Sequence, residues 1–240
     1  MFNKKLSSGV TPLPVRPTQP HQPLTSINGC DYKCATCEGH GKYHCSCHSN
    51  YYCSGKCQIR DWALHEQIHD SYVYRGERPS QQHRRAILFP EAGTRPQIVW
   101  VKMDNAETES YPCDADLDKH IGKDQAISDY MFEAQINLDR RVRYSVQVFY
   151  RADLAGTNEN AVIRGLNNNH FMANWRGPVL CVAFITLKDE NNQVIRVGED
   201  VDCAVLGPVL GSLKWTSQVR PPPDAGLVAV KPKLAGGGVA

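Results

Sequence analysis

The stretch from Cys34 to His69 constrains the fold of this chain more than any other feature of the sequence. It contains six cysteines and ends with two histidines four residues apart, all within 36 residues. Zinc in proteins is bound by four thiolates or imidazoles, which short loops bring together in pairs. The sequence has four such pairs and therefore predicts two four-ligand zinc sites: Cys34 and Cys37, Cys45 and Cys47, Cys53 and Cys57, His65 and His69.

The second half of this stretch has the pattern of a helix. No proline occurs between Ser54 and His69, and Trp62, His65 and His69 recur at helical intervals. Residues four apart lie on one face of a helix. We therefore expect His65 and His69 to present their imidazoles to the same metal ion.

Cysteine usage and hydropathy indicate an intracellular protein. Seven of the ten cysteines lie between Cys30 and Cys57 with zinc-type spacing, and the N-terminus lacks an apolar run of signal-peptide length. No segment reaches 18 apolar residues, so no membrane span is expected. We therefore expect the cysteines to bind metal rather than form disulfides. The protein is expected in the nucleus or the cytoplasm, and the sequence does not distinguish the two compartments.

The net charge offers no support for direct binding to nucleic acid. The formal charge is +2, and six thiolates on two divalent ions would change it by −2, to about zero. Non-specific nucleic-acid binding depends on neutralising phosphates with excess positive charge. We therefore expect protein partners rather than nucleic acid.

The cysteine-rich stretch resembles the MYND-type zinc finger. The resemblance rests on the run from Tyr51 to Gln58 (YYCSGKCQ), followed by Asp61-Trp62 and His65. In that family the ligand pairs interleave. The resemblance therefore implies one zinc ion bound by Cys34, Cys37, Cys53 and Cys57, and a second bound by Cys45, Cys47, His65 and His69.

One pair departs from the family pattern. The family has two residues between the cysteines of this pair, whereas only Ser46 separates Cys45 from Cys47. Either the loop tightens around Cys45 and Cys47, or His44 replaces Cys45 as the ligand. The seven-residue gap after Cys37 favours Cys45. The neighbouring Cys30, His40 and His48 are expected to bind no metal, because eight ligands are already assigned.

Two closed sites indicate a structural role for the metal. A catalytic zinc keeps one position open for water, whereas four protein ligands leave none. The resemblance implies a protein-interaction module that binds short proline-rich peptides, with a link to transcriptional regulation. Trp62 would either line the peptide groove or pack beneath the helix. We expect no enzyme activity; the alternative is an enzyme or small-ligand site in the second domain, with the finger as a docking arm.

The composition divides the chain into five segments. A proline-rich tail (1–29) precedes the finger (30–74), a polar linker (75–85) and a second domain (86–216), and a tail rich in proline and glycine (217–240) follows. Both tails are expected to be disordered, because they bury too little apolar surface to offset their ordering entropy. The resulting fold class is α+β: a small two-zinc finger followed by a mixed α+β domain of unknown role.

Apolar patterning predicts the elements of the second domain. Strands are expected at 86–89, 98–103 and 179–187, with 194–197 as a hairpin partner of the last. The alternation from Val142 to Tyr150 predicts a strand with one polar face. Helices are expected near 124–132, at 158–166 and from Val201. Short runs in this region, at 149–152, 160–162 and 175–178, are similar to uncharacterised domains that follow MYND fingers in fungal proteins.

Other candidate motifs carry little chemistry. SET-type lysine methyltransferases also contain MYND fingers, but here the Asn169-His170 and Asp129-Tyr130 pairs occur in the reverse order. The alternating Asp114, Asp116 and Asp118 are interpreted as a solvated acidic turn, and the loop at 167–170 as surface. The segment from Gly207 to Gly211 is interpreted as a turn or helix break, and Cys181 as a small buried side chain.

Overall fold

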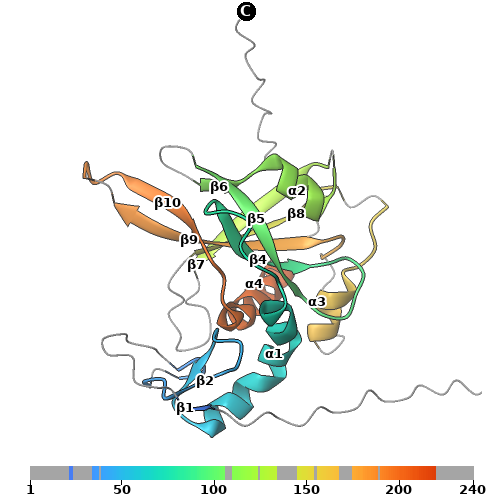
Figure 1. Ribbon diagram of the computed structural model, residues 1–240. Coiled ribbons are helices and arrows are strands. Elements are labelled where there is room, and N and C mark those ends of the chain that lie inside the picture. Colours follow the sequence, from blue (N-terminus) through green and yellow to red (C-terminus); the bar gives the residue numbers. More distant parts are fainter. Residues whose placement is uncertain are drawn as a thin grey trace, which may run out of the picture.

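A computed structural model shows a mixed α+β protein in which the cysteine-rich finger packs against a curled antiparallel sheet (Figure 1). The structure describes residues 22–23, 34–37, 39–105, 110–123, 125–133, 145–153, 156–167, 175–188 and 190–219. Most of both predicted tails, and Cys30, therefore lie outside the described residues. No helix within these ranges is long and apolar enough to cross a membrane.

The finger consists of three very short strands and one long helix. Strands β1 (Gln22–Pro23), β2 (Tyr43–His44) and β3 (Tyr51–Tyr52) form an antiparallel sheet in that order. Helix α1 (Gly55–Val73) follows, and its N-cap Ser54 accepts a hydrogen bond from the backbone N–H of Cys57. This cap satisfies one of the free N–H groups at the helix start. The predicted helix after Ser54 is confirmed.

Seven strands form the sheet of the second region, all in antiparallel pairs. Their order is β6-β5-β4-β9-β8-β7, and β10 pairs with β9 beyond the end of β4. The strands are β4 (His83–Phe89), β5 (Gln97–Asn105), β6 (Ser110–Pro112), β7 (Ile127–Glu133), β8 (Ser145–Arg151), β9 (Val179–Lys188) and β10 (Val194–Glu199). We call residues 83–219 the sheet region. The strands predicted at 86–89, 98–103, 179–187 and 194–197 are confirmed.

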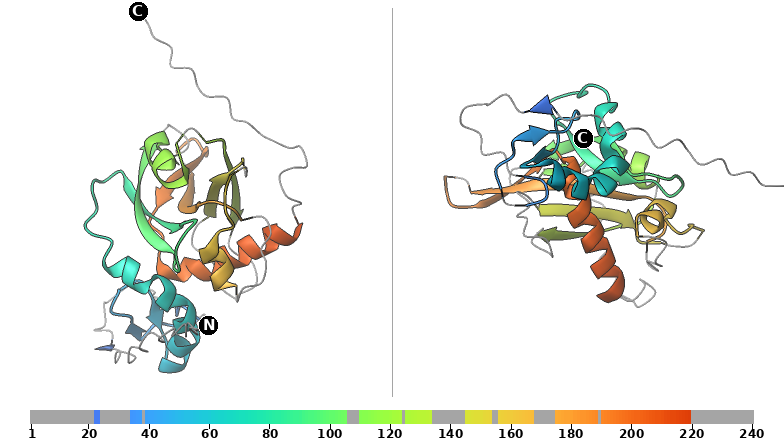
Figure 2. Two further views of the ribbon diagram at one scale, coloured as in Figure 1. Left: turned by 90° about the vertical axis from the view of Figure 1, so that its right-hand side faces the viewer. Right: turned by 90° about the horizontal axis from the view of Figure 1, so that it is seen from below.

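Helices cover both faces of this sheet (Figure 2). Helix α2 (Asp114–Ile121) packs on one face, where its Leu117 and Ile121 join a cluster with Phe149. The C-terminal part of α1, α3 (Ala161–Leu166) and α4 (Leu206–Val219) pack on the other face. Because side chains alternate across a strand, neighbouring residues such as Val148 and Phe149 enter opposite clusters. Both are fully buried.

The burial of β8 on both faces corrects one expectation. The alternating pattern of this segment predicts a polar, exposed face, yet Ser145 and Gln147 are buried. The side-chain amide of Gln147 donates a hydrogen bond to Asp129 on β7, which satisfies one of its polar groups. The neighbouring strand thus makes burial of this polar side chain possible.

The predicted helix at 124–132 is wrong, because this segment forms β7. All seven residues of β7 pair with β8, from Ile127 opposite Arg151 to Glu133 opposite Ser145. Tyr130 and Phe132, two residues apart, both pack against the same core cluster. This period-two pattern is that of a strand, and pairing with β8 outweighs any local helix preference.

Two further expectations change in the structure. The Asp114–Asp118 segment forms α2 rather than a turn, since Asp114 and Asp116 favour the positive end of the helix dipole and Gly122, at φ 124°, ends it. The segment from Gly207 to Gly211 lies within α4 and is not a break. That helix follows a 3-10 turn (Cys203–Val205) and extends three residues past the predicted domain end at 216. Helix α3 starts at Ala161, after the cap Asn160, within the predicted 158–166.

Helix α1 joins the finger to the sheet region. Its last two turns bury Ile68 and Tyr72 in the same cluster as residues of α4. The hydroxyl of Ser71 accepts a hydrogen bond of 2.7 Å from the backbone N–H of Ile98 on β5. Strand β4 begins at His83, inside the segment predicted as a linker, so only a short connection separates the helix from the sheet.

Candidate metal centres

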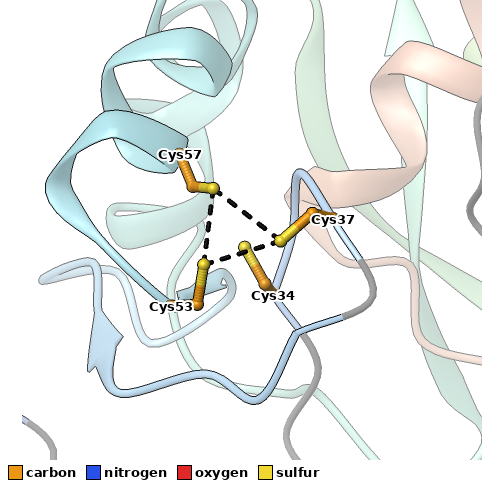
Figure 3. Close-up of side chains that lie close together, drawn as sticks. All are labelled: Cys34, Cys37, Cys53 and Cys57. Atoms are coloured by element: carbon orange, nitrogen blue, oxygen red, sulfur yellow. Dashed lines mark hydrogen bonds between the residues drawn. The ribbon is translucent and has the colours of Figure 1, made fainter.

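Four cysteines form a first candidate metal centre, which we call the outer group. Cys34 and Cys37 come from the loop before β2, Cys53 follows β3, and Cys57 lies in the first turn of α1 (Figure 3). Their sulfur atoms lie within 4.8 Å of one another, and the Sγ–Sγ distances from Cys53 are 3.5 Å to Cys37 and 3.4 Å to Cys57. Four sulfurs around one tetrahedral zinc ion would be about 3.8 Å apart. The outer group therefore fits a single zinc-sized ion.

Backbone hydrogen bonds of the loop position the outer group. The N–H of Cys34 donates to the carbonyl of Gly39 at 2.8 Å, and the Thr36 hydroxyl donates to the carbonyl of Cys57 at 2.8 Å. A Cβ atom at Gly39 would lie 3.4 Å from the Cys37 sulfur, so a small residue suits this position. The loop and the helix start are thus held together independently of the sulfur atoms.

The same loop favours a thiolate at Cys34. Burial opposes its ionisation, but hydrogen bonds from the backbone of Thr36, Cys53 and Cys37 outweigh this effect and lower the pKa of Cys34 to about 7. The thiolate is the form that binds metal. This local arrangement therefore favours metal binding at neutral pH.

Cys45, Cys47, His65 and His69 form a second candidate centre, the inner group. The two cysteines follow β2, and the two histidines lie one turn apart on α1. The Cys47 sulfur is 3.4 Å from Nε2 of His65, and three of the four residues are buried. The structure therefore brings all eight predicted ligands into two groups of four, with the interleaved pairing that the family resemblance implies.

The structure places His44 outside both groups. Its Nδ1 lies 3.0 Å from the carbonyl oxygen of Cys45, and its ring stacks on His48 with 4.5 Å between centroids. Cys45 is 4% exposed and belongs to the inner group. The tight Cys45-Ser46-Cys47 loop is closed by the carbonyl of Cys45, which accepts the N–H of His48 at 2.8 Å. His48 itself adopts φ 58°.

A polar network around Asp61, which no motif in the sequence indicates, lies beside His65. Nδ1 of His65 lies 3.8 Å from the Asp61 carboxylate, one helical turn earlier. The same carboxylate oxygen accepts hydrogen bonds from the Tyr52 hydroxyl at 2.7 Å and the Asn50 amide at 2.8 Å. Burial and the Asp61 charge raise the pKa of Tyr52, so it stays a donor. Nδ1 of His65 itself forms no hydrogen bond among the described residues, so Asp61 lies beside the ring at more than hydrogen-bond distance. A carboxylate in this position is the usual group that orients a ligand histidine.

Trp62 packs against the inner group. Its ring centroid lies 5.7 Å from those of both His65 and His69. The side chain is partly buried and packs against the core cluster. A hydrogen bond with the Cys45 sulfur and the nearby Asp70 carboxylate raise the pKa of His69. Trp62 thus shields the imidazoles from one side while retaining some exposed surface.

The sheet region also contacts the inner group. The hydroxyl of Ser49 accepts a hydrogen bond of 2.7 Å from the backbone N–H of Cys203, and the N–H of Ser49 points to the Cys47 sulfur at 3.4 Å. The Cys203 thiol raises the pKa of Cys47 to about 12. A bound divalent cation reverses such a shift, because it replaces the thiol proton. The predicted set of ligands gave no sign of this contact, since Cys203 is distant in the sequence.

The donor chemistry of both groups suits zinc. Four thiolates, or two thiolates with two imidazoles, are the usual sets of structural zinc sites. Each group supplies four protein donors from within the finger, which matches the coordination number of a structural ion. The structure is therefore consistent with two zinc ions bound by the finger.

The remaining candidates from the sequence do not assemble into a site. Cys181 is fully buried in β9, where burial raises its pKa. Asp114, Asp116 and Asp118 lie along α2. Asn168–His170 and Cys30 lie outside the described residues.

Comparison with known proteins identified no relative. No family model matches the chain. No curated protein and no solved structure matches it either. The class of protein that fold and site define is therefore an α+β protein with a candidate zinc-binding finger.

Proposed function

We propose that this protein is a MYND-like zinc protein that recruits protein partners by binding extended, proline-rich segments along the finger. Two zinc ions would hold the finger in shape and take no part in chemistry. Both groups supply four protein donors, so neither offers the open position that a catalytic zinc requires. We accordingly propose no enzyme activity.

The pairing of β1 with β2 carries this proposal. Gln22 and Pro23 lie antiparallel to His44 and Tyr43, so an extended segment of the proline-rich region adds a strand to the finger. The other edge of β2 pairs with β3. Strand addition at a free edge is a common way of binding peptides, in which main-chain hydrogen bonds provide affinity. A partner segment of similar character would use the same edge in place of residues 22–23.

Metal binding at the two groups would keep this edge rigid. β2 and β3 each contain two residues, and two-stranded elements of this size are not stable alone. Cys45 follows β2 directly, and Cys53 follows β3 directly, so each strand ends at a metal ligand. The ions would thereby fix the edge that receives the peptide, and binding should depend on metal.

A peptide titration tests the proposal. A synthetic peptide with the sequence of residues 10–25 is added to the full chain loaded with zinc, and backbone amide signals are followed by NMR. We expect saturable shifts of Tyr43 and His44 as the peptide displaces the chain's own segment, and loss of these shifts after zinc is removed by a chelator. A peptide with alanine in place of each proline is the control. Shifts that are absent, or equal for both peptides, would contradict the proposal.

A further inference from the structure

A groove lies where the end of α1 meets the sheet region, away from the edge of β2. It has a volume of about 440 Å³ and is lined by the end of α1, the connection to β4, and residues of β4 and β5. Three arginines, two acidic residues and one tryptophan supply its functional groups: Arg75, Arg78, Arg85, Glu77, Asp200 and Trp100. We call it the junction groove.

Aromatic rings hold the three guanidinium groups in place. Arg75 and Arg85 both lie over the Tyr72 ring, with Cζ-to-centroid distances of 4.4 and 4.7 Å. The Trp100 ring lies near both Arg75 and Arg78, at 5.7 and 5.2 Å. Stacking on aromatic faces leaves the N–H edges of a guanidinium directed outwards in its plane. The arginines are therefore ordered for binding before any ligand arrives.

The acidic residues do not fully neutralise these arginines. Asp200 accepts a hydrogen bond from the Arg78 side chain and forms an ion pair with the Arg85 guanidinium at 3.0 Å. Arg75 forms no ion pair among the described residues, and its terminal nitrogen donates to the backbone carbonyl of Tyr72. Three arginines with two acids leave a surplus of one positive charge in the groove.

Three N–H groups around the groove also have no acceptor. Nε of Arg75, Nε of Arg85 and Nε1 of Trp100 are buried and form no hydrogen bond among the described residues. Buried donors without a partner are rare in native proteins and destabilise the fold. Arg78, whose side chain is 39% exposed, lies over the Trp100 ring and is the most accessible of the three arginines to a ligand in the groove.

We propose that the junction groove binds a carboxylate side chain on an acidic segment of a protein partner. A carboxylate offers oxygen acceptors for the free N–H groups and matches the paired donors of a guanidinium. Its single negative charge equals the surplus charge of the groove, whereas a phosphate group would bring nearly twice that charge. This inference rests on the proposed role in partner recruitment. It adds a second contact, in which the junction groove binds an acidic segment of the partner while the edge of β2 binds a proline-rich one.

An NMR titration of the full, zinc-loaded chain tests this inference. The probe is a capped hexapeptide of glutamate and glycine, and the matched probe has glutamine in place of glutamate. We expect the Trp100 indole N–H and the Arg75 Nε–H signals to shift saturably with the glutamate peptide only. The indole signals of Trp62, Trp175 and Trp215 are internal references and should not move.

Two arginine variants distinguish specific binding in the junction groove from a general effect of the protein's positive charge. Arg75→Gln should weaken binding of the glutamate peptide about tenfold, as expected for loss of a charge-assisted hydrogen-bonding partner. Arg95→Gln, at an exposed position outside the groove, should leave it unchanged. If Arg75→Gln disturbs the free protein's spectrum, the more exposed Arg78→Gln takes its place, with the same expected direction.

Several outcomes would overturn the inference. These are equal shifts with the glutamate and glutamine peptides, equal affinities of Arg75→Gln and Arg95→Gln, or inorganic phosphate displacing the peptide at lower concentration than the peptide itself needs. The proline-rich peptide of the previous test is followed through Tyr43 and His44, and the acidic peptide through Trp100. Failure of one contact is therefore distinguishable from failure of the other.

Discussion

The finger and the sheet region of this protein are stabilised by different interactions. Besides cysteines, the buried apolar side chains of the finger are Ala35, Tyr52, Ile68 and Tyr72 among the described residues, and the last two contact the sheet region. The sheet region instead has two large apolar clusters, one on each face, and the few buried side chains of the finger join the edge of one of them. A segment of about forty residues rarely has a sufficient core without metal or disulfides. Metal binding at the two candidate groups would therefore give the finger the stability that apolar burial gives the sheet region.

Removing the metal should produce the largest difference between the two regions. Structural zinc contributes on the order of 10 kcal/mol per site at neutral pH, almost all of it in the finger. After chelation, we expect backbone amides of β2, β3 and the first half of α1 to lose protection from hydrogen exchange. Those of β8 and β9 should keep it. Equal loss of protection in both regions would show that they unfold together, and would contradict the view that different interactions stabilise them.

Single ligand substitutions sharpen this contrast within the finger. Cys45→Ser should remove one of two zinc ions and destabilise the finger, because it takes a donor from the inner group. His44→Ala should leave both ions bound, since the His44 ring contacts a carbonyl and His48. Native mass spectrometry counts the ions. Loss of an ion from His44→Ala, with two retained by Cys45→Ser, would reverse the assignment.

A core substitution should affect the sheet region without altering the metal content. Phe149 is fully buried in the cluster beneath α2, so Phe149→Ala should lower the free energy of unfolding by about 3–5 kcal/mol. Leu187 on β9, which is 47% exposed, provides the control: Leu187→Ala should change the free energy of unfolding by less than about 0.5 kcal/mol. Denaturant unfolding measures both. Loss of zinc from folded Phe149→Ala would contradict the separation of the two regions.

Asp61 links the polar network of the finger to one of its two metal groups. Asp61→Asn should weaken metal binding at the inner group about 10- to 100-fold, because the carboxylate beside Nδ1 of His65 is lost. The outer group should keep its affinity. Competition with a chromophoric chelator resolves the two sites, and Glu66→Gln, on the same helix without a described contact, is the control. An equal loss at both groups would indicate a general loss of structure instead.

His120 offers the smallest and most local test, because it is a partly buried histidine of the sheet region rather than a candidate ligand. Burial and nearby Lys119 lower its pKa, and its Nε2 has no hydrogen-bond partner among the described residues. Its contribution to stability should therefore be complete above about pH 6.5, the unfolded value, and fall as the pH drops below it. An NMR titration of the imidazole should give a pKa below 6.5. A value above it would contradict the burial.

The sequence predicts well which cysteine and histidine side chains come together, because the spacing within each pair is short. Each pair spans at most five residues, so loop and helix geometry alone place both members at one ion. Strands β4, β5, β9 and β10 are equally predictable, since their apolar runs are bounded by turn residues. The interleaved pairing follows from the family resemblance and not from the spacing alone.

The segment of β7 and the acidic segment of α2 were harder to assign. Ile127–Glu133 contains residues compatible with either structure, and its pairing with β8 decides for a strand. Asp114–Ile121 has only two buried side chains, Leu117 and Ile121, which is too weak a pattern to detect without the sheet that it covers.

What the sequence by itself determined is the set of candidate metal ligands in the finger, because short-range geometry suffices to bring the members of each pair together. Only the tertiary structure decided which groups surround them. The Asp61 carboxylate lies beside His65, one helical turn away. The backbone N–H of Cys203 donates to Ser49, 154 residues earlier, and the Arg85 side chain donates to the Tyr72 hydroxyl at the junction. Contacts between distant segments depend on how whole elements pack, and no local pattern encodes that packing. The junction groove and its free donors are therefore a product of the fold as a whole.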